Sequence, residues 1–294
     1  MLAARKMLVP RVAAVARRSF STNKDGGTSR LVVHRQDGGI AAVQMTSGPV
    51  NALSHGMCED LLAVLKDLEE DSSVRGLILG SSVPGIFSAG LHLPELLLPK
   101  DGSVEGIAAY WTAAQEFWLA FYTTQLATVA AMPGHCIGGG MLPALSCDAR
   151  VMVEGKAQLG LNETTFGLVT PLWLNKLFID TIGNKRIAED MLMRGVLVGP
   201  EEAEKLGLVD AVVPLSRLSE EAHARMNLLL AVPDVSRGLL KKQLRAEAAD
   251  ALRQVQAEDL DTFITMVADP ASQQRIATYL ESLSSAGKQA SNDD

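Results

Sequence analysis

The sequence predicts an α/β fold with a largely parallel sheet, because short apolar strands alternate with longer helical stretches. Three runs have the length and composition of buried strands: residues 75–82 (RGLILGSS), 126–132 (LATVAAM) and 149–154 (ARVMVE). The segments between them include a long helical stretch at about 103–125 and a helix that begins in GGGMLPALSCD, residues 138–148. The chain has 294 residues, 47% of them hydrophobic, which is enough for one large domain or a domain with an appended subdomain.

Two elements are expected ahead of the first of these strands. Residues 31–46 (LVVHRQDGGIAAVQMT) predict a β-hairpin that turns at Asp37-Gly38-Gly39. Ser54 is a suitable N-cap for a helix. The apolar stripe of that helix consists of Met57, Leu61, Val64, Leu65 and Leu68.

The second half of the chain changes character. QLGL begins a short strand, and after about residue 171 nearly everything reads as helix except LVDAVVP at 208–214. The last helices carry apolar stripes that need cover from the same subunit or from another one. We therefore expect a core at residues 30–214, a helical region at 215–285 and a disordered tail at 286–294.

The N-terminus is strongly basic. Residues 1–24 contain six basic side chains and no acidic one, in alternation with Ala, Val and Leu, which is typical of a mitochondrial transit peptide. A basic tail without a targeting role is the alternative. RSFS at 18–21 resembles a matrix-protease site with the cut after Phe20, so the sequence predicts the mitochondrial matrix.

Composition excludes several classes of function. Cleavage after Phe20 removes five positive charges and changes the formal net charge from −7 to −12, which disfavours nucleic-acid binding. No apolar run is long enough to span a bilayer. Cys58, Cys136 and Cys147 are scattered and have no metal-ligand spacing, so we expect them to be reduced and buried, with no metal site.

Two glycine-rich stretches follow buried strands: FSAGLHL (87–93) and HCIGGGM (135–141). Glycine lets backbone N–H groups approach a ligand, and a helix that begins at such a turn favours negative charge. Two N–H groups that face each other would form an oxyanion hole. HCIGGGM lacks the Lys-Ser/Thr of a phosphate loop, and Ser88 lacks the glycine spacing of a nucleophile elbow.

A third stretch, LGLNETTFGL (159–168), places Glu163 among apolar residues. No Lys or Arg lies between Lys156 and Lys176 to pair with it in sequence, and an unpaired carboxylate is costly in such surroundings. Glu163 is either an ordinary loop glutamate or a base whose pKa the apolar neighbours raise.

Five segments in this order resemble the crotonase (enoyl-CoA hydratase/isomerase) superfamily, over roughly residues 30–285. They are VNALS (50–54), IFSAGLHL (86–93), GGGMLPALSCDAR (138–150), LGLNETTFGLVTP (159–171) and EAEKLGLVDAVVP (202–214). Within that superfamily, GLNET and the WLNKLFIDTIG behind it (173–183) are similar to the Δ3,Δ2-enoyl-CoA isomerases of mitochondria.

The resemblance implies a crotonase-like spiral of ββα units with a C-terminal helical region that forms a homotrimer. It also implies an acyl-CoA substrate and no metal or other cofactor. The oxyanion donors would be the backbone N–H groups of Leu91 and Gly139. The acyl-CoA site would be lined by Ala89, Gly90, Leu91, His92 and Leu93, with Asn162 as a further contact or a turn-former.

The number of carboxylates decides the expected reaction. Hydratases of this superfamily orient water with two of them, and the first would sit at Leu142, where an aliphatic side chain stands. Glu163 alone is suited to take a proton from C2 of a 3-enoyl-CoA and return it at C4. The alternatives are a hydratase and a non-catalytic crotonase-fold protein that binds RNA or a partner, and the acidity of the mature chain argues against RNA.

Two features leave the interpretation open. Superfamily members often have Asp where this chain has His92, which is either a solvated loop residue or a contact to substrate or to Glu163. The C-terminal region has four closely spaced cations, which either meet CoA phosphates across a subunit interface or form a solvated helix face: Arg237, Lys241, Lys242 and Arg245.

Overall fold

The computed structural model describes residues 29–290, and the side chains of residues 29–283. The predicted transit peptide at residues 1–24 lies outside the described residues, as do residues 291–294. The last helix continues to Ala290, so residues 286–290 are helical where the sequence predicted a disordered tail. None of the described helices combines the length and apolar character that crossing a membrane requires.

The larger of two sheets has six strands, all parallel to their neighbours except for the first pair. In spatial order they are β1 (Leu31–Gln36), β2 (Ile40–Met45), β3 (Gly76–Ser81), β5 (Ala127–Met132), β7 (Ala149–Val153) and β9 (Ala211–Val213). The predicted hairpin is confirmed as the antiparallel pair of β1 and β2, which turns through Gly38 and Gly39 at positive φ.

The smaller sheet is parallel and has the order β4 (Ile86–Ser88), β6 (His135–Ile137) and β8 (Leu159–Gly160). Each of its strands follows a strand of the larger sheet, which gives the repeats β3–β4, β5–β6 and β7–β8. This repetition confirms the expected spiral. Two of these strands, β4 and β6, are too short to show as strands in the sequence.

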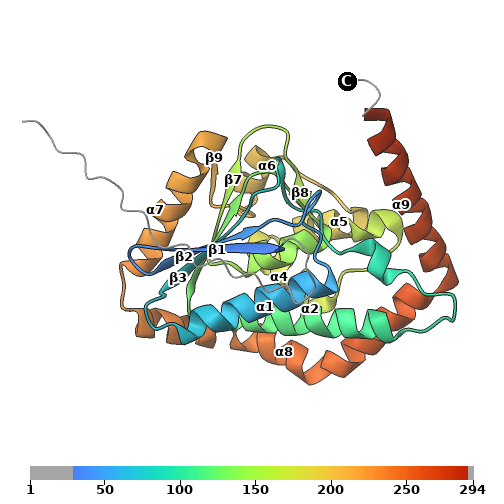
Figure 1. The fold of residues 1–294 in the computed structure, drawn as a ribbon, viewed down its shortest axis with the longest axis horizontal. Helices are drawn as coiled ribbons and strands as arrows, with labels where there is room; N and C mark the ends of the chain where they lie inside the picture. The colour runs from blue at the N-terminus through green and yellow to red at the C-terminus, as the bar shows by residue number, and fades with distance from the viewer. Residues whose placement is uncertain (1–28, 291–294) are drawn as a thin grey trace, which may run out of the picture.

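Helices surround the two sheets (Figure 1). They are α1 (His55–Glu70), α2 (Glu105–Thr123), α3 (Met141–Ser146), α4 (Leu172–Ile182), α5 (Lys185–Arg194), α6 (Pro200–Lys205), α7 (Leu218–Leu230), α8 (Asp234–Ala268) and α9 (Pro270–Ala290). The Ser54 cap is confirmed, because its side chain accepts a hydrogen bond from the Met57 N–H at 3.1 Å.

Both faces of the large sheet are covered, which explains the continuous apolar runs of its central strands. In β3, Leu77 and Leu79 belong to the main core that α1 and α2 also line. Ile78 faces the other way and packs beneath α7. Figure 1 shows α1, α2 and α8 side by side along one edge of the molecule, with α7 apart from them.

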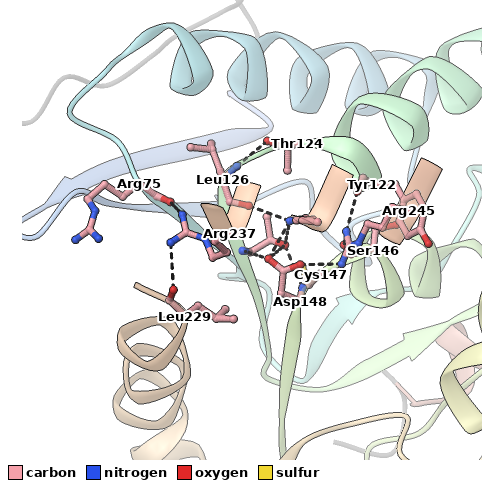
Figure 2. A network of polar contacts seen from close by, with 12 residues as sticks. Arg75, Tyr122, Thr124, Leu126, Ser146, Cys147, Asp148, Leu229, Arg237 and Arg245 are labelled. Carbon is pink, nitrogen blue, oxygen red and sulfur yellow. Dashed lines mark hydrogen bonds and ion pairs between the residues drawn. The ribbon is translucent and has the colours of Figure 1, made fainter. Parts of the chain in front are cut away.

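A buried ion cluster fixes α8 to the sheet. Lys241 Nζ lies 2.8 Å from Asp148 Oδ2 and also donates to Leu126 O, and Arg245 binds Asp148 Oδ1 at 2.8 Å (Figure 2). Arg237 donates to Asp234 and to Leu229 O.

These internal contacts overturn both expectations for three of the four C-terminal cations. Arg237, Lys241 and Arg245 neither face solvent as a charged surface nor point outward to meet phosphates. Lys242 is exposed. Burial lowers the pKa of Lys241 to about 8, an effect that the Asp148 carboxylate opposes.

Asp148→Ala is expected to lower the free energy of unfolding by about 3–5 kcal/mol, because it leaves two cations in a buried place without their partner. Urea denaturation measures the change. Asp250→Ala is the matched control, since Asp250 pairs with Arg253 on the surface and is expected to contribute less than about 1 kcal/mol. Equal losses in the two variants would contradict this role for the cluster.

Candidate active site

The first glycine stretch forms a loop that pairs with the VNALS segment. Ala89 N donates to Val50 O at 3.0 Å, and Leu53 N donates to Gly90 O at 2.7 Å. Leu53 and Leu91 form a parallel β-bridge. The Leu91 N–H takes part in none of these bonds, so it is available to a ligand on the other side of the loop.

Asn51 and Ser88 hold this pairing from within the core. Asn51 is fully buried at a φ of 45°, and its amide donates to Ser81 Oγ at 2.7 Å. The Ser88 hydroxyl donates to Asn51 O at 2.7 Å. A non-glycine residue rarely adopts a positive φ. We therefore infer that these hydrogen bonds hold the backbone of Asn51 in its conformation.

The second glycine stretch brings its backbone against the first. Gly138–Gly140 form a 3₁₀ turn that leads into α3, and such a start leaves N–H groups without partners inside the helix. A Cβ placed on Gly90 would lie 3.0 Å from Gly139 N, and one on Gly139 would lie 3.3 Å from Leu91 N. Only glycine allows this approach, which brings the amides of Leu91 and Gly139 together.

Glu163 lies beside the second glycine stretch, at the start of the 3₁₀ turn Glu163–Phe166. Its side chain is buried, and a Cβ placed on Gly138 would lie 3.2 Å from Glu163 Oε1. Oε2 has no hydrogen-bond partner among the described residues. Burial raises the pKa of this carboxyl to about 7, while a hydrogen bond from its own backbone N–H acts in the other direction.

Two small cavities meet at Glu163. The outer one has a volume of about 40 Å³, and its walls include Ala89, Leu93, Ile137, Asn162 and Tyr279. The inner one, of about 20 Å³, is lined mainly by apolar side chains. Both cavities share Leu91, Gly139, Glu163 and Leu168.

The inner cavity adjoins a larger space, which is lined by apolar side chains together with polar ones that include Glu258 and Asp259. Leu142 lines the inner cavity, so an aliphatic side chain faces the same space as the Glu163 carboxyl. A cavity of about 460 Å³ adjoins it and shares Trp111, Phe263 and Met266 with it. Glu163 is the only acidic residue among the described walls of the two small cavities.

The structure brings most of the predicted site residues together. Ala89, Leu91, Leu93, Gly139, Asn162 and Glu163 all line the outer cavity. Gly90 lies behind them, against Gly139. His92 is not among the residues that line either small cavity; its Nδ1 lies 3.2 Å from Glu95 Oε1.

Several lining residues were not singled out from the sequence. Trp111 comes from α2, Phe263 and Met266 from α8, and Tyr279 from α9. Each belongs to an apolar helical stripe, and that pattern is the same whether a residue packs in the core or borders a cavity. The sequence carried no signal that could have separated the two cases.

No described group of acidic, histidine and cysteine side chains could hold a metal ion. The three cysteines are free and buried in this part of the chain, as the sequence predicted. What the site presents is a pair of amides that can bind a carbonyl oxygen and one carboxylate beside it. This arrangement favours proton transfer next to a carbonyl group.

Comparison with known proteins agrees with this arrangement. A family model described as enoyl-CoA hydratase/isomerase matches residues 35–289. The protein "Enoyl-CoA delta isomerase 1, mitochondrial" of Rattus norvegicus is 37% identical over 284 residues, which is 96% of this chain and 97% of the relative. The Homo sapiens protein of that name is 38% identical over 259 residues, or 87% of this chain and 84% of the relative.

Solved structures share the fold. The crystal structure of human mitochondrial delta3-delta2-enoyl-CoA isomerase has a TM-score of 0.84 and 37% identity, and the match covers 87% of this chain and 99% of that one. An enoyl-CoA hydratase from Bacillus halodurans has a TM-score of 0.76 at 22% identity, covering 85% of this chain and 100% of that one, which shows the fold alone. The resemblance seen in the motifs is therefore confirmed, and the chain belongs to the enoyl-CoA hydratase/isomerase family.

Proposed function

We propose that the protein is an enoyl-CoA delta isomerase of the β-oxidation of unsaturated fatty acids, which converts a 3-enoyl-CoA into the trans-2-enoyl-CoA. One observation carries the proposal: a single buried carboxylate, Glu163, borders the same small space as the amides of Leu91 and Gly139. The 37% identity to the rat isomerase over nearly the whole chain supports it.

The reaction follows from these three groups. The thioester oxygen accepts hydrogen bonds from the N–H groups of Leu91 and Gly139, which stabilises the enolate and acidifies C2. Glu163 takes a proton from C2, the electron pair spreads over a planar dienolate, and the same carboxyl returns the proton to C4. The double bond moves from 3,4 to 2,3 without loss or gain of atoms.

Leu142 argues against hydration. Addition of water requires a second carboxylate to orient the water molecule, and the position that holds it in the hydratases of this family carries an aliphatic side chain here. That side chain lies in the wall of the inner cavity, where it excludes water from the carboxyl. The larger cavity of about 460 Å³ offers room for the rest of the acyl chain.

The deciding assay offers the protein a 3-enoyl-CoA and, separately, a 2-enoyl-CoA. Formation of the conjugated 2-enoyl thioester from the first is expected, with little 3-hydroxyacyl-CoA from the second. Substantial 3-hydroxyacyl-CoA would make the protein a hydratase. Binding of both compounds without turnover would make it a non-catalytic member of the family.

The activity is expected to depend on pH through Glu163. Only the ionised carboxylate can accept the C2 proton, so kcat/KM for isomerisation is expected to fall as the pH drops through about 7 and to level off above it. A steady-state series on both sides of neutrality measures the profile. A profile that is flat across this range would show that another group acts as the base.

We place the protein in mitochondria, as the names of its relatives indicate, and within them in the matrix, as the basic leader predicts. A homotrimer is part of the proposal. In its support, α7 and α8 expose large apolar side chains that the described residues of one chain leave uncovered: Leu228, Val235, Leu239, Leu240 and Leu244. Sedimentation equilibrium of the mature protein gives the number of chains.

A further inference from the structure

The hydroxyl group of Tyr110 bridges two backbone groups beside the first glycine stretch, residues 87–93, which we call the oxyanion loop. Tyr110 lies in α2 and is fully buried. Its oxygen accepts a hydrogen bond from the His92 N–H at 3.0 Å and donates one to the carbonyl oxygen of Leu53. One hydroxyl thus uses both of its capacities, as donor and as acceptor.

The two bridged groups belong to the segments that position Leu91. His92 is the next residue after Leu91, and Leu53 is paired with Leu91 in the parallel bridge. On the near side of that bridge, Leu53 N bonds directly to Gly90 O at 2.7 Å. At the other end of the bridge, the Tyr110 hydroxyl joins the carbonyl oxygen of Leu53 to the N–H of His92. It thereby completes the pairing that fixes the Leu91 backbone.

Two other tethers hold this end of the loop, and neither bonds to the peptide between Leu91 and His92. The backbone N–H of Glu95 donates to His92 O at 3.0 Å, beyond that peptide. Glu95 accepts the His55 N–H at 2.7 Å and lies 3.2 Å from the His92 ring. These contacts bond neither to the carbonyl oxygen of Leu91 nor to the N–H of His92. Among the described contacts of this end of the loop, the Tyr110 hydroxyl is therefore the one that restrains the peptide adjoining the donor.

Tyr110 is suited to a constant restraint. Burial holds its pKa well above the usual range for tyrosine, so the hydroxyl keeps its proton at any pH where the protein works. It is not among the residues that line the two small cavities, so it does not border the space for the reacting atoms.

We infer that Tyr110 is a positioning residue of the isomerase, which sets the direction of the Leu91 N–H through the backbone of His92 and Leu53. The inference rests on the proposed function. Loss of the hydroxyl leaves two buried backbone groups without their partner, and the loop relaxes to satisfy them. The Leu91 N–H then points less accurately at the thioester oxygen, while the rest of the substrate site stays as it was.

Tyr110→Phe tests the inference by removing one oxygen atom. The expected result is a fall in kcat of about 10- to 100-fold with little change in KM, because the misplaced donor matters most when charge develops on the oxygen. Tyr122→Phe is the matched control: Tyr122 lies in the same helix, is also buried and stacks on Trp118 away from the loop. It is expected to keep wild-type kcat.

A second readout follows the carbonyl directly. The C=O stretch of an acyl thioester bound to the wild-type protein is expected at lower frequency than in water, because two N–H groups polarise it. In Tyr110→Phe this shift becomes smaller, and in Tyr122→Phe it does not change. A merely structural role for Tyr110 would lower the melting temperature and leave the carbonyl shift as it is.

The outcomes separate the two proposals. If the wild-type protein does not isomerise 3-enoyl-CoA, the proposed function fails. If the wild type is active and Tyr110→Phe matches it in kcat and carbonyl shift, the inference about Tyr110 is overturned. If Tyr110→Phe does not fold, amide hydrogen exchange in the wild type decides: exchange of the His92 N–H at the rate of an unbonded amide also overturns it.

Discussion

Replacing Glu163 with glutamine is expected to lower kcat for isomerisation by about 10²–10⁴-fold, the usual contribution of a positioned acid/base group. KM is expected to change little, since glutamine keeps the size and polarity of the side chain. The structure gives the reason: no other described carboxylate borders the two small cavities, so no neighbour can take over the proton transfer.

The same substitution is expected to stabilise the fold at high pH. The pKa of Glu163 is about 7 in the folded protein against an ordinary value of 4.5, so the folded state favours the protonated form. Its stabilising contribution is complete below pH 4.5 and is lost as the pH rises through 7. At roughly 1.4 kcal/mol per pH unit, the ionised carboxylate costs the fold up to about 3 kcal/mol above that range.

Glutamine cannot ionise, so Glu163→Gln is expected to exceed the wild type in stability at pH 8 and to match it near pH 4.5. Urea denaturation at the two pH values measures both effects. The control is Glu154→Gln, which removes the same charge from an exposed residue and is expected to alter neither activity nor pH dependence. Full activity in Glu163→Gln would show that the base has been assigned to the wrong residue.

The sequence predicted the fold well where local patterns determine it. The hairpin, the Ser54-capped helix and the buried strands β3, β5 and β7 each arise from signals within a short window. The smaller sheet could not be predicted in this way, because β4 and β6 have three residues each and their strand character comes from pairing with distant segments.

The part of the site that could be predicted consists of its glycines and its isolated carboxylate. Gly90, Gly139 and Glu163 are unusual in their local surroundings, and unusual residues can be read from one sequence. Tyr110 and Trp111 are not unusual: they sit in a regular apolar helix, and only the fold shows that one touches the oxyanion loop and the other a cavity.

For the cations of α8, the sequence carried a clear signal, but the prediction drawn from it was wrong. A run of basic residues is usually a solvated surface, so the sequence favoured an outward-facing group. Lys241 and Arg245 instead reach Asp148, which lies about a hundred positions earlier in the chain. Neither segment has a local sequence pattern that indicates pairing with the other. The spacing of the basic residues alone therefore could not have identified these ion pairs.

Gly90→Ala is expected to lower kcat by about 10²–10³-fold, the usual cost of losing one oxyanion donor. Gly90 has a φ of +94°, which an alanine adopts only with strain. Its Cβ would also lie 2.9 Å from Ile137 O and 3.0 Å from Gly139 N. The two loops must move apart, so the amides of Leu91 and Gly139 no longer converge on one oxygen atom.

The control for backbone strain is Gly102→Ala. Gly102 has a similar φ of +74°, but nothing lies within 4 Å of a Cβ placed there, so the variant carries the strain without the collision. It is expected to lose some stability and to retain wild-type kcat. If Gly90→Ala and Gly102→Ala lose stability alike and both keep full activity, the close approach of the two glycine loops does not serve catalysis. A loss of kcat in Gly90→Ala alone, at unchanged KM, would show that the rate depends on the convergence of the Leu91 and Gly139 amides.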